Sequence, residues 1–159
     1  MRTIRFLSTA ALMLANLAAA NNVCPVTKPP SPAFIPPAPY QVNPGLNAFW
    51  FGDKDLWTLL PIDGVWSGLP LNANKNYFNK VFLWQQGYDG KTEPQPDVNV
   101  VVRRLDANAA VYKTQYATNA FFDYTWQILT DVTFMSEGCW EITATHNRHN
   151  LTFVVSVQP

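Results

Sequence analysis

The sequence predicts an all-β fold in which two sheets pack face to face, and three observations support this. From Asn47 onward, short apolar runs alternate with turn signals such as Pro61-Ile62-Asp63-Gly64. No long window keeps the 3.6-residue apolar spacing of a helix. Aromatic residues make up 14% of the chain and charged residues only 14%, against a usual charged share of about 25%. Together these features favour a single immunoglobulin-like sandwich, with a small β-barrel as the alternative.

Nine segments read as strands and one as a short helical turn. The strands are expected at 47–51, 56–60, 64–69, 79–85, 97–104, 110–116, 131–135, 139–145 and 151–158. In the last two, apolar side chains occupy every second position, so each strand should bury one face. The polar loop 146–150 between them predicts a hairpin. A helical turn is expected over 121–129, because Phe122, Trp126 and Leu129 would share a face.

The first 20 residues predict a secretory signal peptide that is not part of the fold. Arg2 and Arg5 precede an apolar stretch, Phe6–Leu14, and an A-x-A site predicts cleavage between Ala20 and Asn21. The apolar stretch is too short to span a bilayer, and no later window approaches 18 apolar residues. We therefore expect a secreted or periplasmic protein with no membrane span in the mature chain.

The mature chain divides into an arm over residues 21–46 and a sandwich domain over 47–159. Residues 25–44 hold eight of the 13 prolines, which excludes helix and central strand and favours an extended arm. Cys24 in the arm and Cys139 in the domain are the only cysteines, so an exported chain predicts one disulfide. Alternation places Cys139 opposite Trp140, so the arm should cross the outer face or edge of a sheet.

The charge balance disfavours two classes of partner. Without residues 1–20 the chain keeps nine Lys and Arg against 11 Asp and Glu, a net charge of about −2. A nucleic-acid-binding protein needs a basic face, and only the pair Arg103-Arg104 is basic here. We expect instead a protein or glycan partner at the cell envelope, with no nucleic acid and no cofactor.

The C-terminal strands carry a resemblance to a known group. The segment Gly138-Cys139-Trp140-Glu141-Ile142-Thr143-Ala144, followed by Leu151-Thr152-Phe153-Val154-Val155, resembles uncharacterised bacterial secreted proteins that share this Gly-Cys-Trp-Glu-Ile/Val-Thr strand. Further matching positions are Trp57, Asp63-Gly64, Lys80 and 103–106, so the resemblance spans about residues 47–157. It implies a bacterial exported protein with an immunoglobulin-like fold, and it implies no activity.

Two kinds of candidate site can be named. His146 and His149, the only histidines, could begin a metal or hydrolytic site, but their loop holds no Asp, Glu or Cys, and a solvated polar turn is the favoured interpretation. No G-x-S-x-G elbow, phosphate-binding glycine loop or selected carboxylate pair accompanies them. The ligand platform would consist of Trp50, Trp57, Trp66 and Trp84, whose rings could stack on sugars; burial in the core is the favoured alternative.

The sequence therefore predicts an exported, non-catalytic β-sandwich module that acts as a binding or envelope-structural domain. One alternative is a carbohydrate-binding module that uses exposed tryptophans. The other is a hydrolase or metal protein that uses the loop of His146 and His149. The three differ in which side chains must reach solvent.

Overall fold

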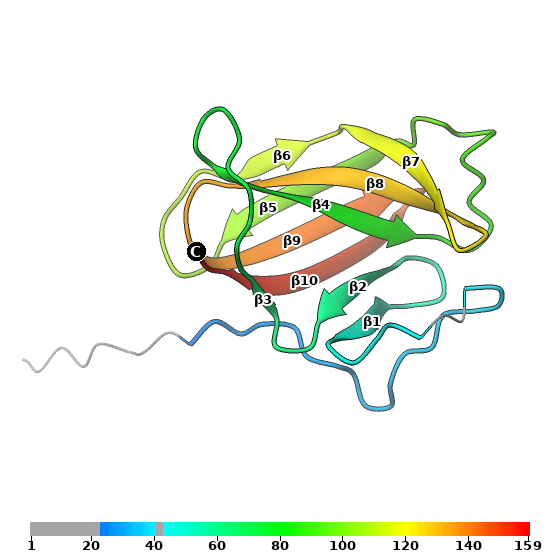
Figure 1. Cartoon of the computed structure of the whole chain (residues 1–159). Helices are drawn as coiled ribbons and strands as arrows, with labels where there is room; N and C mark the ends of the chain where they lie inside the picture. Colours follow the sequence, from blue (N-terminus) through cyan, green and yellow to red (C-terminus); the bar gives the residue numbers. More distant parts are fainter. Residues whose placement is uncertain (1–22, 41–42) are drawn as a thin grey trace, which may run out of the picture.

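Every regular element that the structure describes is a β-strand (Figure 1). The structure is a computed structural model and describes residues 23–40 and 43–159. The expected signal peptide and its cleavage site between Ala20 and Asn21 lie outside the described residues. Within them, no helix is long and apolar enough to cross a membrane.

Ten strands form two five-stranded sheets. They are β1 (Ala48–Gly52), β2 (Trp57–Pro61), β3 (Val65–Trp66), β4 (Tyr77–Trp84), β5 (Val98–Arg104), β6 (Tyr112–Thr114), β7 (Ala117–Phe122), β8 (Thr125–Phe134), β9 (Gly138–His146) and β10 (His149–Val157). The first sheet has the order β1-β2-β4-β8-β7 and the second β3-β10-β9-β5-β6. Neither sheet closes on itself, so the all-β sandwich is confirmed and the barrel alternative is wrong.

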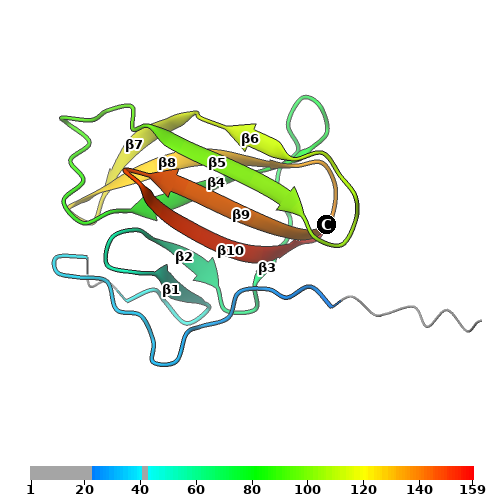
Figure 2. The ribbon, with the colours of Figure 1, turned by 180° about the vertical axis from the view of Figure 1, so that it is seen from behind.

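The connectivity is that of an immunoglobulin-like sandwich. In the second sheet, β9 lies between β5 and β10, all antiparallel, and Figure 2 shows these three strands on the near side. In the first sheet, β8 lies between β4 and β7. The chain changes sheets between β2 and β3, and β3 pairs in parallel with the final strand β10. These two groups match the two strand sets of the immunoglobulin sandwich.

Period-two alternation builds the core between the sheets. Trp140, Ile142 and Ala144 of β9 are at most 1% exposed, whereas the residues between them are half-buried. On β5, Val98, Val100 and Val102 are fully buried in the same way. Burying each such large side chain stabilises the fold by about 1.5–3 kcal/mol. The core therefore contains the face of the second sheet that packs against the first sheet.

The expected helical turn at 121–129 is wrong. Residues 117–122 and 125–134 form the β7–β8 hairpin, and its two turn residues, Asp123 and Tyr124, have φ values of 47° and 62°. A two-residue turn with positive φ at both positions matches the twist of a hairpin. Trp126 packs toward the core, whereas Phe122 is exposed, so the spacing that suggested one helix face spans two faces of a sheet.

A covalent strap fixes the start of the arm. The sulfur atoms of Cys24 and Cys139 are 2.06 Å apart, and Cys139 is buried on the outer face of the second sheet, opposite Trp140. Beyond it, Thr27 N–H donates to the carbonyl of Val154 (2.9 Å), and Val154 N–H donates to Thr27 Oγ1 (2.8 Å). The arm therefore satisfies backbone groups at the free edge of β10, which an open edge would leave unpaired.

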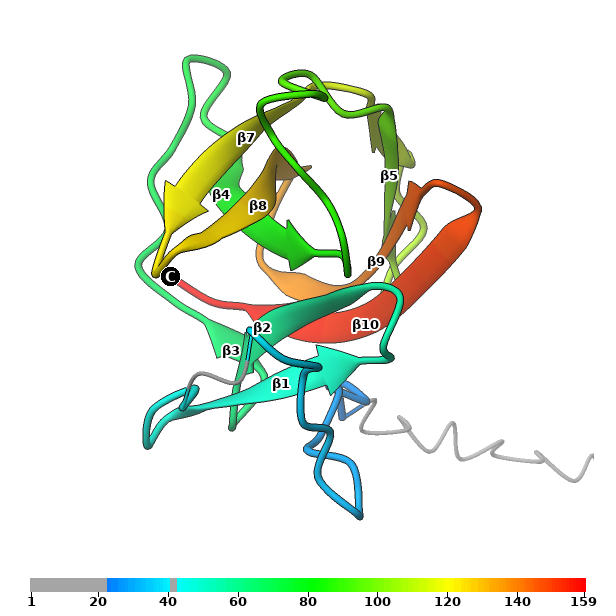
Figure 3. The same ribbon diagram turned by 90° about the vertical axis from the view of Figure 1, so that its right-hand side faces the viewer.

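The later part of the arm packs on the outer face of the first sheet, as Figure 3 shows beside β1. Tyr40, Trp50, Trp57 and Trp84 form a second buried cluster there, called here the outer cluster, with Phe34 packed against it. The rings of Tyr40 and Trp57 are 5.2 Å apart, and those of Trp50 and Trp84 are 5.0 Å apart. Both ends of the arm are thus held by the sandwich.

Removing the strap is expected to destabilise the fold. The double change Cys24→Ser with Cys139→Ser should lower the free energy of unfolding by about 3 kcal/mol, because the loop closed by the bond spans most of the chain. Urea unfolding followed by tryptophan fluorescence measures this loss. The wild-type protein under reducing conditions is the control and should lose the same amount. A loss below about 1 kcal/mol in both would contradict the role of the strap.

The strap also predicts a dependence on pH. Asp106 Oδ1 accepts a hydrogen bond from Arg104 Nε (2.6 Å), and Asp106 Oδ2 accepts one from Cys139 N–H (3.1 Å). The bond from Arg104 lowers the pKa of Asp106, and the bond from Cys139 acts in the same direction. The contribution of the carboxylate is therefore present above its unfolded-state pKa and is lost as pH falls through the folded pKa.

Asp106→Asn should thus be less stable than wild type at pH 7, by about 0.5 kcal/mol for this solvent-exposed pair. The difference should shrink as the pH falls below about 4, where the carboxylate of the unfolded chain becomes protonated, and should be lost as the pH falls through the lowered pKa of the folded state. Urea unfolding from pH 2 to 7 measures it. Asp97→Asn, for which the structure records no ion pair, is the matched control. A constant difference across this range would refute the argument.

Candidate functional site

A groove of about 510 Å³ lies on the outer face of the first sheet, between the arm and the tip of the β7–β8 hairpin. It is called here the sheet groove. Its lining is Trp50, Leu59, Phe82, Trp84, Thr125, Gln127 and residues 120–123, with Tyr40, Asn43 and Pro44 from the arm. All five strands of the first sheet contribute to it. A site assembled from five paired strands has a largely preformed shape.

Strand alternation explains why these side chains share one face. On β4, Val81 and Leu83 point into the core, so Phe82 and Trp84 point outward. Antiparallel register then aligns neighbours across the sheet: Trp50 lies opposite Leu59, and Ala120 lies opposite Gln127. Directly opposed residues of an antiparallel pair lie side by side on the same face. The groove is therefore a consequence of the sheet pairing.

The groove exposes apolar surface at a cost. Phe82 is 40% exposed and Phe122 is 65% exposed. Phe82 and Trp84 pack together with their ring centroids 6.2 Å apart, and Trp84 in turn contacts Trp50. Concave, mostly apolar surfaces that stay open to solvent are the usual places where a domain binds small molecules. The outer face of the first sheet is thus the part of this surface best suited to binding.

One polar side chain in the groove has no partner. Gln127 is 4% exposed and lines the groove, and in the part of the chain that the structure describes its side-chain amide makes no hydrogen bond. The neighbouring hydroxyl of Thr125 is already used, since it donates to the carbonyl of Phe122 (3.0 Å). Trp57 Nε1 is the one enclosed and unpaired side-chain polar atom among the described residues, so the amide of Gln127 is accessible to a molecule in the groove.

Charge is sparse around the groove. Asp123, in the turn between β7 and β8, is the one acidic residue of the lining, and the described lining holds no Lys, Arg or His. An anionic ligand would find a like charge there and no cation. The electrostatics of the groove therefore favour an uncharged ligand.

The predicted tryptophan platform does not form as one surface. Trp57 is fully buried beneath the arm, and its Nε1 has no hydrogen-bond partner in the described structure. Trp66 is half-buried on the other sheet, against Phe134 and Phe153. Trp50 and Trp84 do line the groove, although each is only 9% exposed.

The sequence interpretation missed Phe82, Phe122 and Gln127 as site residues. A signal for the first was present, because the run from Val81 to Trp84 is apolar at consecutive positions. A strand with one solvated face alternates, so a continuous apolar run means that both faces are covered or bind something. Gln127 carried no such signal, since an amide on a strand is ordinarily a surface residue.

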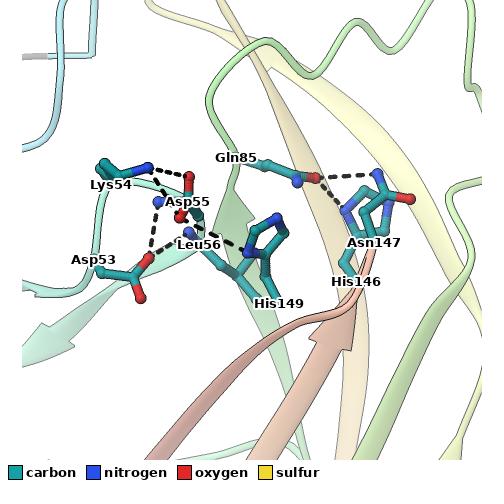
Figure 4. A network of polar contacts seen from close by, with 8 residues as sticks. All are labelled: Asp53, Lys54, Asp55, Leu56, Gln85, His146, Asn147 and His149. Atoms are coloured by element: carbon teal, nitrogen blue, oxygen red, sulfur yellow. Dashed lines mark hydrogen bonds and ion pairs between the residues drawn. The ribbon is translucent and has the colours of Figure 1, made fainter.

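The histidine loop is the expected solvated turn at Asn147, Arg148 and Asn150, but His146 is enclosed. His146 is 1% exposed, with Nδ1 2.5 Å from Gln85 Oε1 and Nε2 3.3 Å from Glu93 Oε1 (Figure 4 shows the contact to Gln85). The ring of Tyr88 packs edge-on against the imidazole, and burial raises the pKa of Tyr88 to about 12. His146 therefore holds the end of β4 and the 85–93 loop against β9.

His149 points elsewhere. Its Nδ1 lies 3.9 Å from Asp55 Oδ2, while Lys54 Nζ donates to the same carboxylate (Figure 4). Among residues 23–40 and 43–159, no group of three or more His, Cys, Asp or Glu side chains is arranged to hold a metal ion. The two histidines thus take part in two separate contacts between the β9–β10 hairpin and the rest of the chain.

Comparison with known proteins leaves the sheet groove as the main guide to function. No family model, no curated protein and no solved structure matches this chain. The functional argument therefore depends on the burial, charge and hydrogen bonding of the groove residues.

The histidine contacts predict a contrast between two neighbouring substitutions. His146→Ala should lower the free energy of unfolding by about 2 kcal/mol or more, because it leaves a cavity and unpaired polar groups at Gln85 and Glu93. His149→Ala should change it by less than about 0.5 kcal/mol, because His149 is 40% exposed. Urea unfolding at pH 7 measures both, and equal losses would contradict the assignment.

Proposed function

We propose that this protein is an exported, non-catalytic β-sandwich module that binds a ligand or partner at the cell envelope through the sheet groove. The single observation that carries the proposal is the groove itself: an apolar surface that the chain assembles from five strands and leaves open. Exposed apolar surface brings no stability, so its retention is best explained by binding. The paired cysteines fit an oxidising compartment, such as the periplasm or the extracellular space.

Three of the groups that could perform catalysis make structural contacts. Asp53 Oδ1 accepts the backbone N–H groups of Asp55 and Leu56, and Asp63 Oδ1 accepts that of Val65. These are turn-stabilising contacts of the kind that short carboxylates commonly make. The imidazole of His146 is enclosed in the fold and does not line the groove. This distribution supports a binding role more than a hydrolytic or metal-dependent one.

A carbohydrate-binding module is the second candidate. It is favoured by the aromatic rings of Trp50, Phe82 and Trp84, which lie in one groove beside an amide. Such a module would use the same groove, although with two of the four expected tryptophans. Membership in the group of bacterial secreted proteins stays a prediction.

Binding at the groove can be tested by heteronuclear NMR on the oxidised protein. A fragment library containing sugars, short peptides and aromatic compounds should shift the side-chain NH₂ signals of Gln127 and the indole N–H signals of Trp50 and Trp84. The indole signal of Trp140, which is buried in the core, should not move. Phe82→Ser should abolish the shifts by making the floor polar.

Met135→Ser is the matched control, because Met135 is 43% exposed, close to the 40% of Phe82, and lies outside the groove. It should leave the shifts intact. Shifts gathered on the second sheet or on the histidine loop would refute the groove as the binding surface.

A further inference from the structure

We propose that the sheet groove takes a small, uncharged, mostly apolar molecule with a single hydrogen-bonding group, and that this group pairs with the amide of Gln127. The inference rests on the proposed function, because it names the ligand class of the same groove. Four properties of the groove lead to it: size, lining, the unpaired amide and charge.

The size and lining suit a small molecule. A volume of about 510 Å³ lies within the range of about 300–1,000 Å³ that is usual for small-molecule sites. Trp50, Phe82 and Trp84 supply ring surface, and Leu59 and Phe122 extend it to both sides. A flat or branched apolar body can therefore displace water from most of the groove.

The amide of Gln127 determines which polar group the ligand must carry. Gln127 is almost fully buried and lines the groove, so a ligand that covers its amide must offer it a hydrogen-bonding group. A purely hydrocarbon ligand would leave the amide unpaired and would bind about tenfold more weakly than one that satisfies it. The amide offers a donor and an acceptor side by side, so a hydroxyl, amine, carbonyl or amide group on the ligand would serve.

A sugar has more hydroxyl groups than the groove has hydrogen-bonding partners for them. A saccharide ring carries several hydroxyls, and burying them without partners reduces affinity. The hydroxyl of Thr125 donates to Phe122, and Asn43 Oδ1 accepts the N–H of Gly45. Only the amide of Gln127, the NH₂ group of Asn43 and the carboxylate of Asp123 then remain for the hydroxyls of a sugar. A glycan would therefore bind with most of its hydroxyls left to solvent, at the exposed rim.

The charge of the lining disfavours anionic ligands. Fatty-acid carboxylates and phosphate headgroups are anions, and the described lining offers them Asp123 and no cation. An uncharged ligand meets no such repulsion. The carboxylate of Asp123 thus repels anions, while the apolar side chains of the groove favour neutral molecules.

The test uses the neutral dye N-phenyl-1-naphthylamine, which has an apolar aromatic body and one N–H donor. Titrated into the oxidised wild-type protein, the dye should gain fluorescence and quench Trp50 and Trp84 by energy transfer. Gln127→Met keeps the size of the side chain but removes the amide, and should weaken binding about fivefold to tenfold. Phe82→Ser should abolish binding, and Met135→Ser should leave it unchanged.

An anionic dye and two oligosaccharides test which class of ligand the groove prefers. The anionic dye 1-anilinonaphthalene-8-sulfonate, which has a similar aromatic body, should bind at least tenfold more weakly than the neutral dye. Cellohexaose and chitohexaose at millimolar concentration should fail to displace the neutral dye. The shift of the Gln127 NH₂ signals on dye binding in the wild-type protein reports the amide contact without any substitution.

The outcomes separate this inference from the proposed function. If an oligosaccharide or the anionic dye binds more tightly in the groove, the ligand class is wrong while the groove remains the binding surface. If Gln127→Met binds the dye as tightly as wild type and the NH₂ signals stay in place, the role of the amide is overturned. If the dye and every fragment bind only outside the groove, both proposals fail.

Discussion

The docking of the arm on the sandwich is the constraint on which the rest of this structure depends. Cys24 fixes the start of the arm on the outer face of the second sheet, and Thr27 then pairs with the edge of β10. Six prolines stiffen the chain between Thr27 and Tyr40. The arm is held by these contacts at its beginning, so Tyr40 meets the outer face of the opposite sheet with little conformational freedom left to lose.

This docking determines how much of the first sheet is covered. Tyr40 and Phe34 cover Trp57, which becomes the most deeply buried ring on that face. Beyond Trp50 and Trp84 the described part of the arm leaves the sheet uncovered, and the apolar surface continues toward Phe122. The groove is therefore the uncovered remainder of one apolar sheet face, with the arm as one wall. Stability and binding use adjacent parts of the same surface.

The sequence predicted those features that depend on local periodicity. The last hairpin and the face of Cys139 follow from alternation alone, so they could be placed without a structure. The β7–β8 hairpin could not, because the turn Asp123-Tyr124 lacks the glycine that usually marks positive φ. The burial of His146 was also out of reach, since its contacts at Gln85 and Glu93 are more than 50 residues away. Strand alternation and turn chemistry depend on neighbouring residues, whereas the burial of a side chain depends on segments that are distant in the sequence.

Two glutamines show why the groove and not the histidine loop is the better functional candidate. Gln127 is 4% exposed, whereas Gln85 is half-buried beside the histidine loop. For Gln85 the chain provides His146 and Asn147, and both contact its Oε1. For Gln127 the chain provides no partner within the described residues, although Thr125 is a neighbour on the same strand face. The amide of Gln127 faces the apolar groove without a partner from the described chain, and this is the feature on which the proposed ligand class depends.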